Sequence, residues 1–179
     1  MRPRDGLAQE GDQFPLHKVL DRAGLGVSLA DSSDLDHLAA AITPQTKLIW
    51  IESPGNPLLS ITDIAACAEL AHRHGALLAV DNTLASPVLT RPLELGADIV
   101  MHSATKFIGG HGTSIGGVVV DSGTFNWSNG RFPVIADPSP AYHGLAFHET
   151  FGVYGYLMKL RAESLRDLGG ALSPFNSFL

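Results

Sequence analysis

Short apolar runs alternate with amphipathic segments along this chain of 179 residues. Strands are predicted at 27–29, 47–51, 76–80, 98–102 and 116–120, of which 47–51 is expected to be buried, and helices at 16–23, 34–42, 63–74 and 147–168. Strands that alternate with helices are typical of a parallel sheet covered by helices. The pattern therefore predicts an α/β fold with a mostly parallel sheet and flanking helices.

Proline and glycine indicate where several of these elements end. The run SPGNP at 53–57 follows the second strand, and its prolines exclude both a helix and a continued strand. Thr62 is a suitable N-cap for the helix at 63–74, and Gly75 is a suitable C-terminal stop. The sequence thus predicts a sharp turn after the second strand and a well-bounded helix behind it.

The second half of the chain is expected to be less regular. A short helical turn is predicted at 92–96. The strand at 116–120 is expected to be antiparallel to the strand before it, because a short loop separates the two. Residues 121–142 are rich in glycine and proline and predict a loop, and the last helix is expected to break near 152–155.

Composition and charge narrow the class of protein. The chain is 45% hydrophobic and 17% charged, as in one globular domain. Its net charge of −6 argues against a nucleic-acid or anionic-membrane partner, because these need clustered basic residues. The apolar runs fall far short of the roughly 18 to 20 residues that span a membrane. Cys67 is the single cysteine and no secretory signal is apparent, so a cytoplasmic protein is expected.

Polar side chains follow three of the predicted strands. Asn56 lies after the strand at 47–51, Asp81 after the strand at 76–80, and Ser103, Thr105 and Lys106 after the strand at 98–102. Ligands of open α/β sheets bind at the carboxyl ends of the strands. We therefore expect an amide, a carboxylate, two hydroxyls and an amine to meet in one crevice.

These groups match the needs of a pyridoxal 5'-phosphate (PLP) site. Such a site requires a lysine for the Schiff base, a carboxylate for the pyridine nitrogen, and hydroxyls for the phosphate. A partly desolvated lysine has a lowered pKa and can act as a nucleophile and then as a base. The glycines at 109, 110, 112, 116 and 117 would let the backbone approach the ligand closely.

Three strings carry a resemblance to a known family. ESPGNP, LLAVDNT and DIVMHSATKFIGGHG resemble the Cys/Met-metabolism PLP-dependent enzymes, which belong to the aspartate-aminotransferase superfamily of fold type I. Asn56 to Asp81 and Asp81 to Lys106 are each 25 positions apart, in the order that three strand ends of this family require. The resemblance implies a PLP-dependent transferase large domain.

The resemblance also implies a role for each residue. Lys106 would bind the cofactor covalently and shuttle protons, and Asp81 would pair with the pyridine nitrogen. Ser103 and Thr105 would bind the phosphate. Asn56 would contact the ring oxygen, and Thr83 would line the pocket.

Within the family, residues 129–152 resemble the O-acetylhomoserine sulfhydrylases. That branch replaces the acetate of O-acetylhomoserine by sulfide or methanethiol, in methionine biosynthesis and transsulfuration, and gives homocysteine or methionine. Methionine γ-lyase and cystathionine γ-synthase or γ-lyase relatives are alternatives. Full-length members are expected to be homo-oligomers.

Parts of the family pattern have no counterpart in this sequence. Full-length members carry an upstream loop that contacts the phosphate, a tyrosine that stacks on the ring, and a smaller C-terminal domain with an arginine for the substrate carboxylate. We therefore expect residues 13–179 to form an incomplete PLP-binding large domain and residues 1–12 to be an unmatched polar start. Exposed edges would favour association, and the lost positioning would impair activity. A non-catalytic remnant that associates with a full-length homologue is the second hypothesis.

Two other kinds of site are excluded by their patterns. The eight histidines form no HExxH or Cys/His motif, so no metal site is predicted. The run GGHGTSIGG at 109–117 resembles a dinucleotide-binding loop, but Ile115 stands where the third glycine is required.

Overall fold

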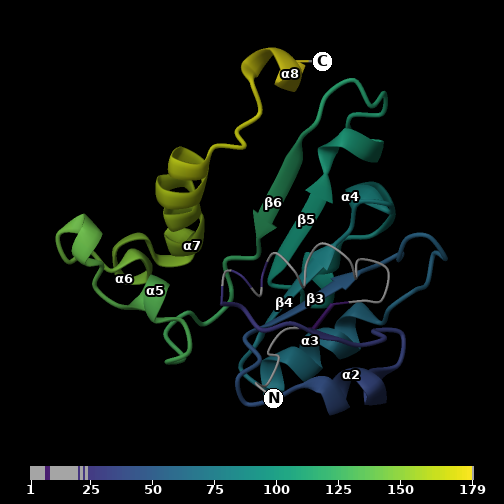
Figure 1. Ribbon diagram of the computed structural model, residues 1–179, viewed down its shortest axis with the longest axis horizontal. Helices are drawn as coiled ribbons and strands as arrows, with labels where there is room; N and C mark the ends of the chain where they lie inside the picture. The colour runs from purple at the N-terminus through teal and green to yellow at the C-terminus, as the bar shows by residue number, and fades with distance from the viewer. Residues whose placement is uncertain (1–6, 9–19, 21, 23, 179) are drawn as a thin grey trace.

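A computed structural model describes residues 7–8, 20, 22 and 24–178 of the chain. In this part of the chain, six strands form one sheet in the order β2-β1-β3-β4-β5-β6 (Figure 1). The strands are β1 (Leu7–Ala8), β2 (Ser28–Leu29), β3 (Leu48–Glu52), β4 (Leu77–Asp81), β5 (Ile99–Ser103) and β6 (Gly117–Asp121). Neighbouring strands are parallel except β5 and β6. The predicted α/β class, the mostly parallel sheet and the antiparallel β6 are confirmed.

Helices and helical turns connect the strands. The α-helices are α2 (Leu35–Ala41), α3 (Ile64–Arg73), α4 (Ser86–Leu89), α5 (Pro133–Ala136), α6 (Phe147–Phe151), α7 (Gly155–Lys159) and α8 (Pro174–Phe178). The other helical turns are η3 (Pro92–Leu95), η4 (Ala104–Ile108), η5 (Pro140–Tyr142), η6 (Gly152–Tyr154) and η7 (Leu160–Leu168). The predicted break near 152–155 is confirmed by η6. The helix predicted at 16–23 lies largely outside the described residues.

Two predictions about local structure are wrong. Residues 121–142 are not a continuous loop, because α5 and η5 begin at Pro133 and Pro140. Proline is well tolerated in the first turn of a helix, where its missing N–H is not needed. The N-cap of α3 is Asp63, whose carboxylate accepts a hydrogen bond from Ala66 N at 3.0 Å. Thr62 is buried, and its hydroxyl instead lies 2.8 Å from Ser32 Oγ.

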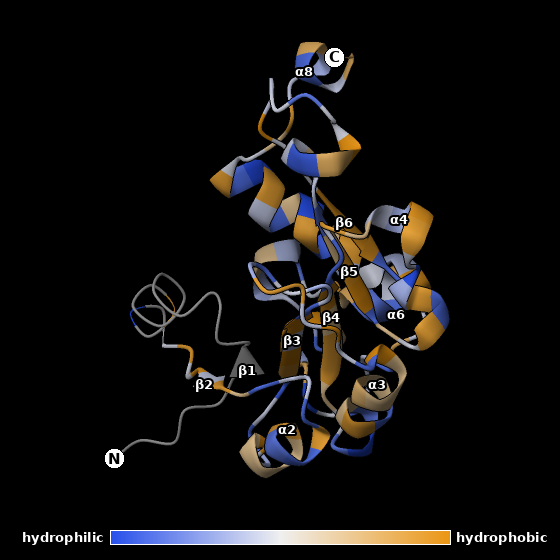
Figure 2. Ribbon diagram, turned by 90° about the vertical axis from the view of Figure 1, so that its right-hand side faces the viewer, coloured by the Kyte–Doolittle hydropathy of each residue, from blue (hydrophilic) through white to orange (hydrophobic). Residues whose placement is uncertain are grey.

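One face of the sheet packs against α3. Side chains alternate between the faces of a strand, so Leu78 and Val80 of β4 point to the same side as Val100 of β5. All three are at most 3% exposed and belong to one core with Ile49, Ile51 and the apolar residues of α3. Figure 2 shows that hydrophobic residues dominate the central strands. The carboxyl ends of β3, β4 and β5 are thereby fixed relative to one another.

A second apolar cluster lies on the other face. Leu77 of β4 packs with Trp127, Phe132 and Phe147, and α5, α6 and α7 gather at this side of the sheet (Figure 1). Arg131 ties this region to the first core, since its guanidinium donates to the backbone oxygens of His74, Pro44 and Thr46. The C-terminal third is thus attached to the strands that carry the site.

Strand β6 presents an apolar outer edge. It ends the sheet among the described strands, and Val118, Val119 and Val120 are 42%, 41% and 39% exposed. An edge strand with free N–H and C=O groups and apolar side chains pairs readily with another chain. We expect Val119→Lys to reduce concentration-dependent association at least about threefold, because a charge opposes edge pairing.

Sedimentation velocity over a concentration series measures this change. Val134→Lys is the matched control, because Val134 is 64% exposed but lies in α5, away from the edge. Equal association of both variants and the parent chain would show that β6 is not the contact.

Candidate cofactor-binding site

The carboxyl ends of β3, β4 and β5 border a cavity of about 430 Å³. This volume is in the range of small-molecule sites. All six residues predicted from the sequence line it, namely Asn56, Asp81, Thr83, Ser103, Thr105 and Lys106. The structure therefore brings together side chains that are up to 50 positions apart in the sequence.

Asp81 places a carboxylate at the end of β4. Its Oδ1 accepts hydrogen bonds from the N–H of Thr83 at 3.0 Å and from the hydroxyl of Thr83 at 2.5 Å. Its Oδ2 accepts no hydrogen bond from any residue in the described ranges. One oxygen is thus fixed in orientation, and the other is available to a cationic N–H donor in the cavity.

Thr83 connects the ends of two strands. Its hydroxyl donates to Asp81 Oδ1 and accepts the N–H of Ser103 at 2.8 Å. Both hydrogen-bonding functions of the hydroxyl are therefore used within the protein. Thr83 lines the cavity as predicted, and its contacts show how it orients Asp81 relative to β5.

Lys106 lies in η4, directly after β5. Gly109 N donates to Ala104 O and Gly110 N to Lys106 O, both at 2.8 Å, so backbone bonds hold the turn. The side chain of Lys106 lines the cavity and forms no hydrogen bond or ion pair with the described residues. Its amine is therefore free to react with a carbonyl group.

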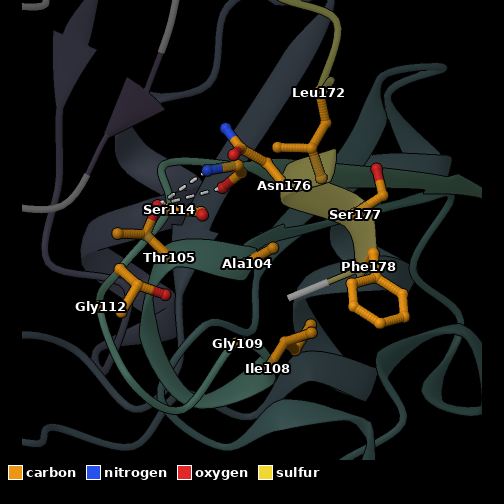
Figure 3. Close-up of a pocket in the computed structure, with 12 residues that line it drawn as sticks. Ala104, Thr105, Ile108, Gly109, Gly112, Ser114, Leu172, Asn176, Ser177 and Phe178 are labelled. Atoms are coloured by element: carbon orange, nitrogen blue, oxygen red, sulfur yellow. Dashed lines mark hydrogen bonds between the residues drawn. The ribbon is translucent and has the colours of Figure 1, made fainter. Parts of the chain in front are cut away.

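The two hydroxyls expected to bind phosphate differ in their surroundings. Thr105 Oγ1 accepts the N–H of Gly116 at 3.0 Å and donates to Gly116 O at 3.3 Å (Figure 3). It thereby closes the glycine-rich loop between η4 and β6. Ser103 Oγ has no hydrogen-bond partner among the described residues, so it is the freer phosphate ligand of the two.

Asn56 enters the cavity from the turn after β3. Gly55 N donates to Ser60 O at 2.8 Å, which closes the turn, and the bonds Ser53–Pro54 and Asn56–Pro57 are cis. The prediction that this segment is neither helix nor continued strand is confirmed. An exposed amide at this position can donate to an oxygen of a bound ligand.

Part of the cavity wall lies outside the residues predicted from the sequence. Leu84, Phe107 and Glu52 also line it, and Glu52 lies opposite Asp81 in the β3–β4 register. The sequence predicts a strand that ends at residue 51, whereas β3 extends to Glu52. Extending the period-2 pattern by one residue would have placed it beside Asp81.

A second cavity of about 320 Å³ adjoins the first and shares Thr105 and Gly112 with it. Figure 3 shows that α8 forms one wall and η4 the other. Leu172 lies against Gly116, where an added Cβ would meet Leu172 Cδ1 at 3.2 Å. The segment before α8 therefore packs directly on the loop that Thr105 closes.

Two further findings limit the kinds of site. In the described ranges, no three His, Cys, Asp or Glu side chains are placed to bind a metal ion together. The helices in those ranges are too short or too polar to cross a bilayer.

The residues of the cavity fit PLP. The cofactor needs a reactive amine, a carboxylate for its pyridine nitrogen and hydrogen-bond donors for its phosphate. Lys106, the free Oδ2 of Asp81 and the free hydroxyl of Ser103 supply these groups within one cavity.

Comparisons with known proteins agree with this geometry. An O-acetyl-L-homoserine sulfhydrylase of Leptospira meyeri is 46% identical over 171 residues, which cover 91% of this chain and 39% of that protein. A homocysteine synthase of Schizosaccharomyces pombe is 48% identical over 173 residues, or 94% of this chain and 40% of that protein. The chain thus spans about two fifths of the length of these relatives.

Solved structures show the same fold. A crystal structure from Campylobacter jejuni, described as an O-acetylhomoserine (thiol)-lyase with N'-pyridoxyl-lysine-5'-monophosphate, has a TM-score of 0.88 and 31% identity over 97% of this chain and 44% of that one. The O-acetylhomoserine sulfhydrylase of Wolinella succinogenes has a TM-score of 0.79 and 33% identity, covering 99% and 48%. The family model of the Cys/Met metabolism PLP-dependent enzymes matches residues 9–179. The chain belongs to this family of PLP-dependent enzymes.

Proposed function

We propose that this chain is the cofactor-binding part of an O-acetylhomoserine sulfhydrylase. The reaction replaces the acetate of O-acetylhomoserine by sulfide to give homocysteine, or by methanethiol to give methionine. The observation that carries the proposal is the cavity in which Lys106, Asp81 and Ser103 meet. The names of the relatives from Leptospira meyeri and Schizosaccharomyces pombe support the choice of substrate.

Each residue has a proposed task. When bound, PLP supplies an electron sink for negative charge next to the substrate α-carbon. Lys106 Nζ holds the cofactor and then moves protons at the substrate carbons. Asp81 Oδ2 keeps the proton on the pyridine nitrogen, and Thr83 keeps Asp81 in place through its bonds to Oδ1.

The phosphate and the ring oxygen have proposed partners as well. Ser103 Oγ donates to the phosphate, because no described residue occupies it. Thr105, in η4, also contacts the phosphate, and its hydrogen bonds to Gly116 close the glycine-rich loop before β6. Asn56 donates to the ring oxygen. The proposal includes a cytoplasmic enzyme that forms homo-oligomers at full length, and the single cysteine, which is buried, agrees with a reducing compartment.

A second candidate comes from the same family. The cystathionine γ-lyase of Lactobacillus plantarum has a TM-score of 0.70 and 37% identity over 99% of this chain and 40% of that one. Its similarity favours a γ-lyase as the alternative, and methionine γ-lyase belongs with it. The cavity residues named above would serve both reactions, so the substrate must separate them.

Addition of candidate substrates to the PLP-loaded chain tests the proposal. O-acetyl-L-homoserine with sulfide is expected to give homocysteine and acetate, because acetate is the group that the proposed reaction replaces. Cystathionine and methionine carry the same amino group and are therefore compared by product and not by spectrum; as matched controls they are expected to release no keto acid at the same concentration. Release of a keto acid from cystathionine or methionine, with no homocysteine from O-acetyl-L-homoserine, would support the lyase alternative and reject the sulfhydrylase.

A further inference from the structure

Two polar side chains lie on the face of the sheet opposite the cofactor cavity. Asp81 is in register with Met101, so the next residues, Asn82 and His102, are neighbours across β4 and β5. Asn82 N donates to Met101 O at 3.0 Å, which continues the ladder to this point. Because side chains alternate, Asn82 and His102 point toward the α3 side, whereas Asp81 and Ser103 point toward the cavity.

Both side chains are buried with an unsatisfied atom. Asn82 is 0% exposed and His102 is 5% exposed. Asn82 Oδ1 and His102 Nδ1 are buried and have no hydrogen-bond partner among the residues that the structure describes. A polar atom that is buried without a partner destabilises the fold, so such atoms are usually satisfied by an ordered water. Because the two unsatisfied atoms belong to neighbouring positions on adjacent strands, they can share one water.

We propose that one internal water molecule bridges His102 Nδ1 and Asn82 Oδ1, and that the bridge makes both side chains positioning residues for the cofactor site. A buried water bonds to polar groups that otherwise lack a partner, and these two atoms belong to neighbouring positions on adjacent strands. His102 Nδ1–H donates to the water oxygen, and the water donates to Asn82 Oδ1. The positioning part rests on the proposed function.

The contacts of Asn82 explain how the bridge reaches the site. Its amide nitrogen donates to Ser86 O at 3.1 Å and to Thr90 O at 2.8 Å, so Asn82 fixes the segment that follows Thr83. His102 directly precedes Ser103, whose N–H is bonded to Thr83 Oγ1 at 2.8 Å. Loss of the bridge would loosen the spacing of β4 and β5 where Asp81 and Ser103 project.

A double-mutant cycle tests the bridge without cofactor. Urea unfolding of the parent chain, Asn82→Leu, His102→Leu and the double variant gives four unfolding equilibrium constants. If the two substitutions acted independently, their effects on the unfolding equilibrium constant would multiply. We expect the constant of the double variant to be at least about fivefold smaller than this product, because the second substitution removes a bridge that the first has already broken. Independent, multiplicative effects would overturn the bridge.

The affinity for PLP tests positioning separately. His102→Leu is expected to weaken PLP binding about tenfold, and His102→Asn, which keeps a donor near Nδ1, is expected to restore most of it. Val100→Ala is the matched control, because Val100 is 3% exposed on the same face of β5 and its loss affects packing alone. If Val100→Ala weakens PLP binding as much as His102→Leu, or if His102→Asn fails to rescue, positioning is refuted. If the parent chain binds no PLP, both the proposed function and the positioning role are refuted. The double-mutant cycle still tests the water bridge in that case, because it is measured without cofactor.

Discussion

Replacing Lys106 by alanine is expected to abolish the absorption band that PLP acquires on linkage to the chain. PLP itself absorbs between roughly 300 and 500 nm, and linkage to a lysine adds a distinct band in this range, so attachment is read from that band after free cofactor has been removed. Lys106 lines the cavity and has no hydrogen bond or ion pair with the described residues that would occupy its amine. The expected loss is therefore complete and is read by titrating each protein with PLP and recording spectra after removal of free cofactor.

Lys47→Ala is the control for unspecific attachment. Lys47 is exposed and directly precedes β3, at the opposite end of the strand from the cavity. It is expected to leave the band unchanged, because surface lysines react with PLP weakly and reversibly. A band that persists in Lys106→Ala and falls in Lys47→Ala would show that the cavity does not hold the cofactor.

The positions of the site residues could be predicted because they follow from strand periodicity. Short apolar runs fix where β3, β4 and β5 end, and parallel strands bring their carboxyl ends to one edge. Asp81 and Lys106 therefore met in the structure as expected. Their chemical roles came from the resemblance to a family, since an aspartate after a strand is more often an ordinary turn residue.

Features that depend on three-dimensional packing could not be predicted. Thr62 and Asp63 are both good N-caps by residue type, and burial of Thr62 against Ser32 decides between them. No sequence pattern indicates the unsatisfied atoms of Asn82 and His102, because the sequence does not distinguish a buried histidine that has a hydrogen-bond partner from one that has none. Strand β1 has two residues, too few for an alternating pattern to appear.

Asp81→Asn is expected to weaken PLP binding about tenfold to a hundredfold. A carboxylate bonded to a protonated ring nitrogen forms a charge-assisted hydrogen bond, and such bonds are worth about 1.5–3 kcal/mol. Asparagine has nearly the same shape and can still accept from Thr83, so the change removes the charge and little else. Titration of absorbance or fluorescence with PLP measures the dissociation constant.

Glu52→Gln separates this specific bond from the general negative potential of the cavity. Glu52 lies opposite Asp81 in the β3–β4 register and lines the same cavity, so its neutralisation changes the net charge there by the same amount. If PLP binding depended on the summed charge, both variants would shift the dissociation constant alike. We expect Glu52→Gln to change it less than about threefold, because Asp81 is the carboxylate with an oxygen held ready by Thr83. Similar effects of the two variants would show that Asp81 is not the partner of the pyridine nitrogen.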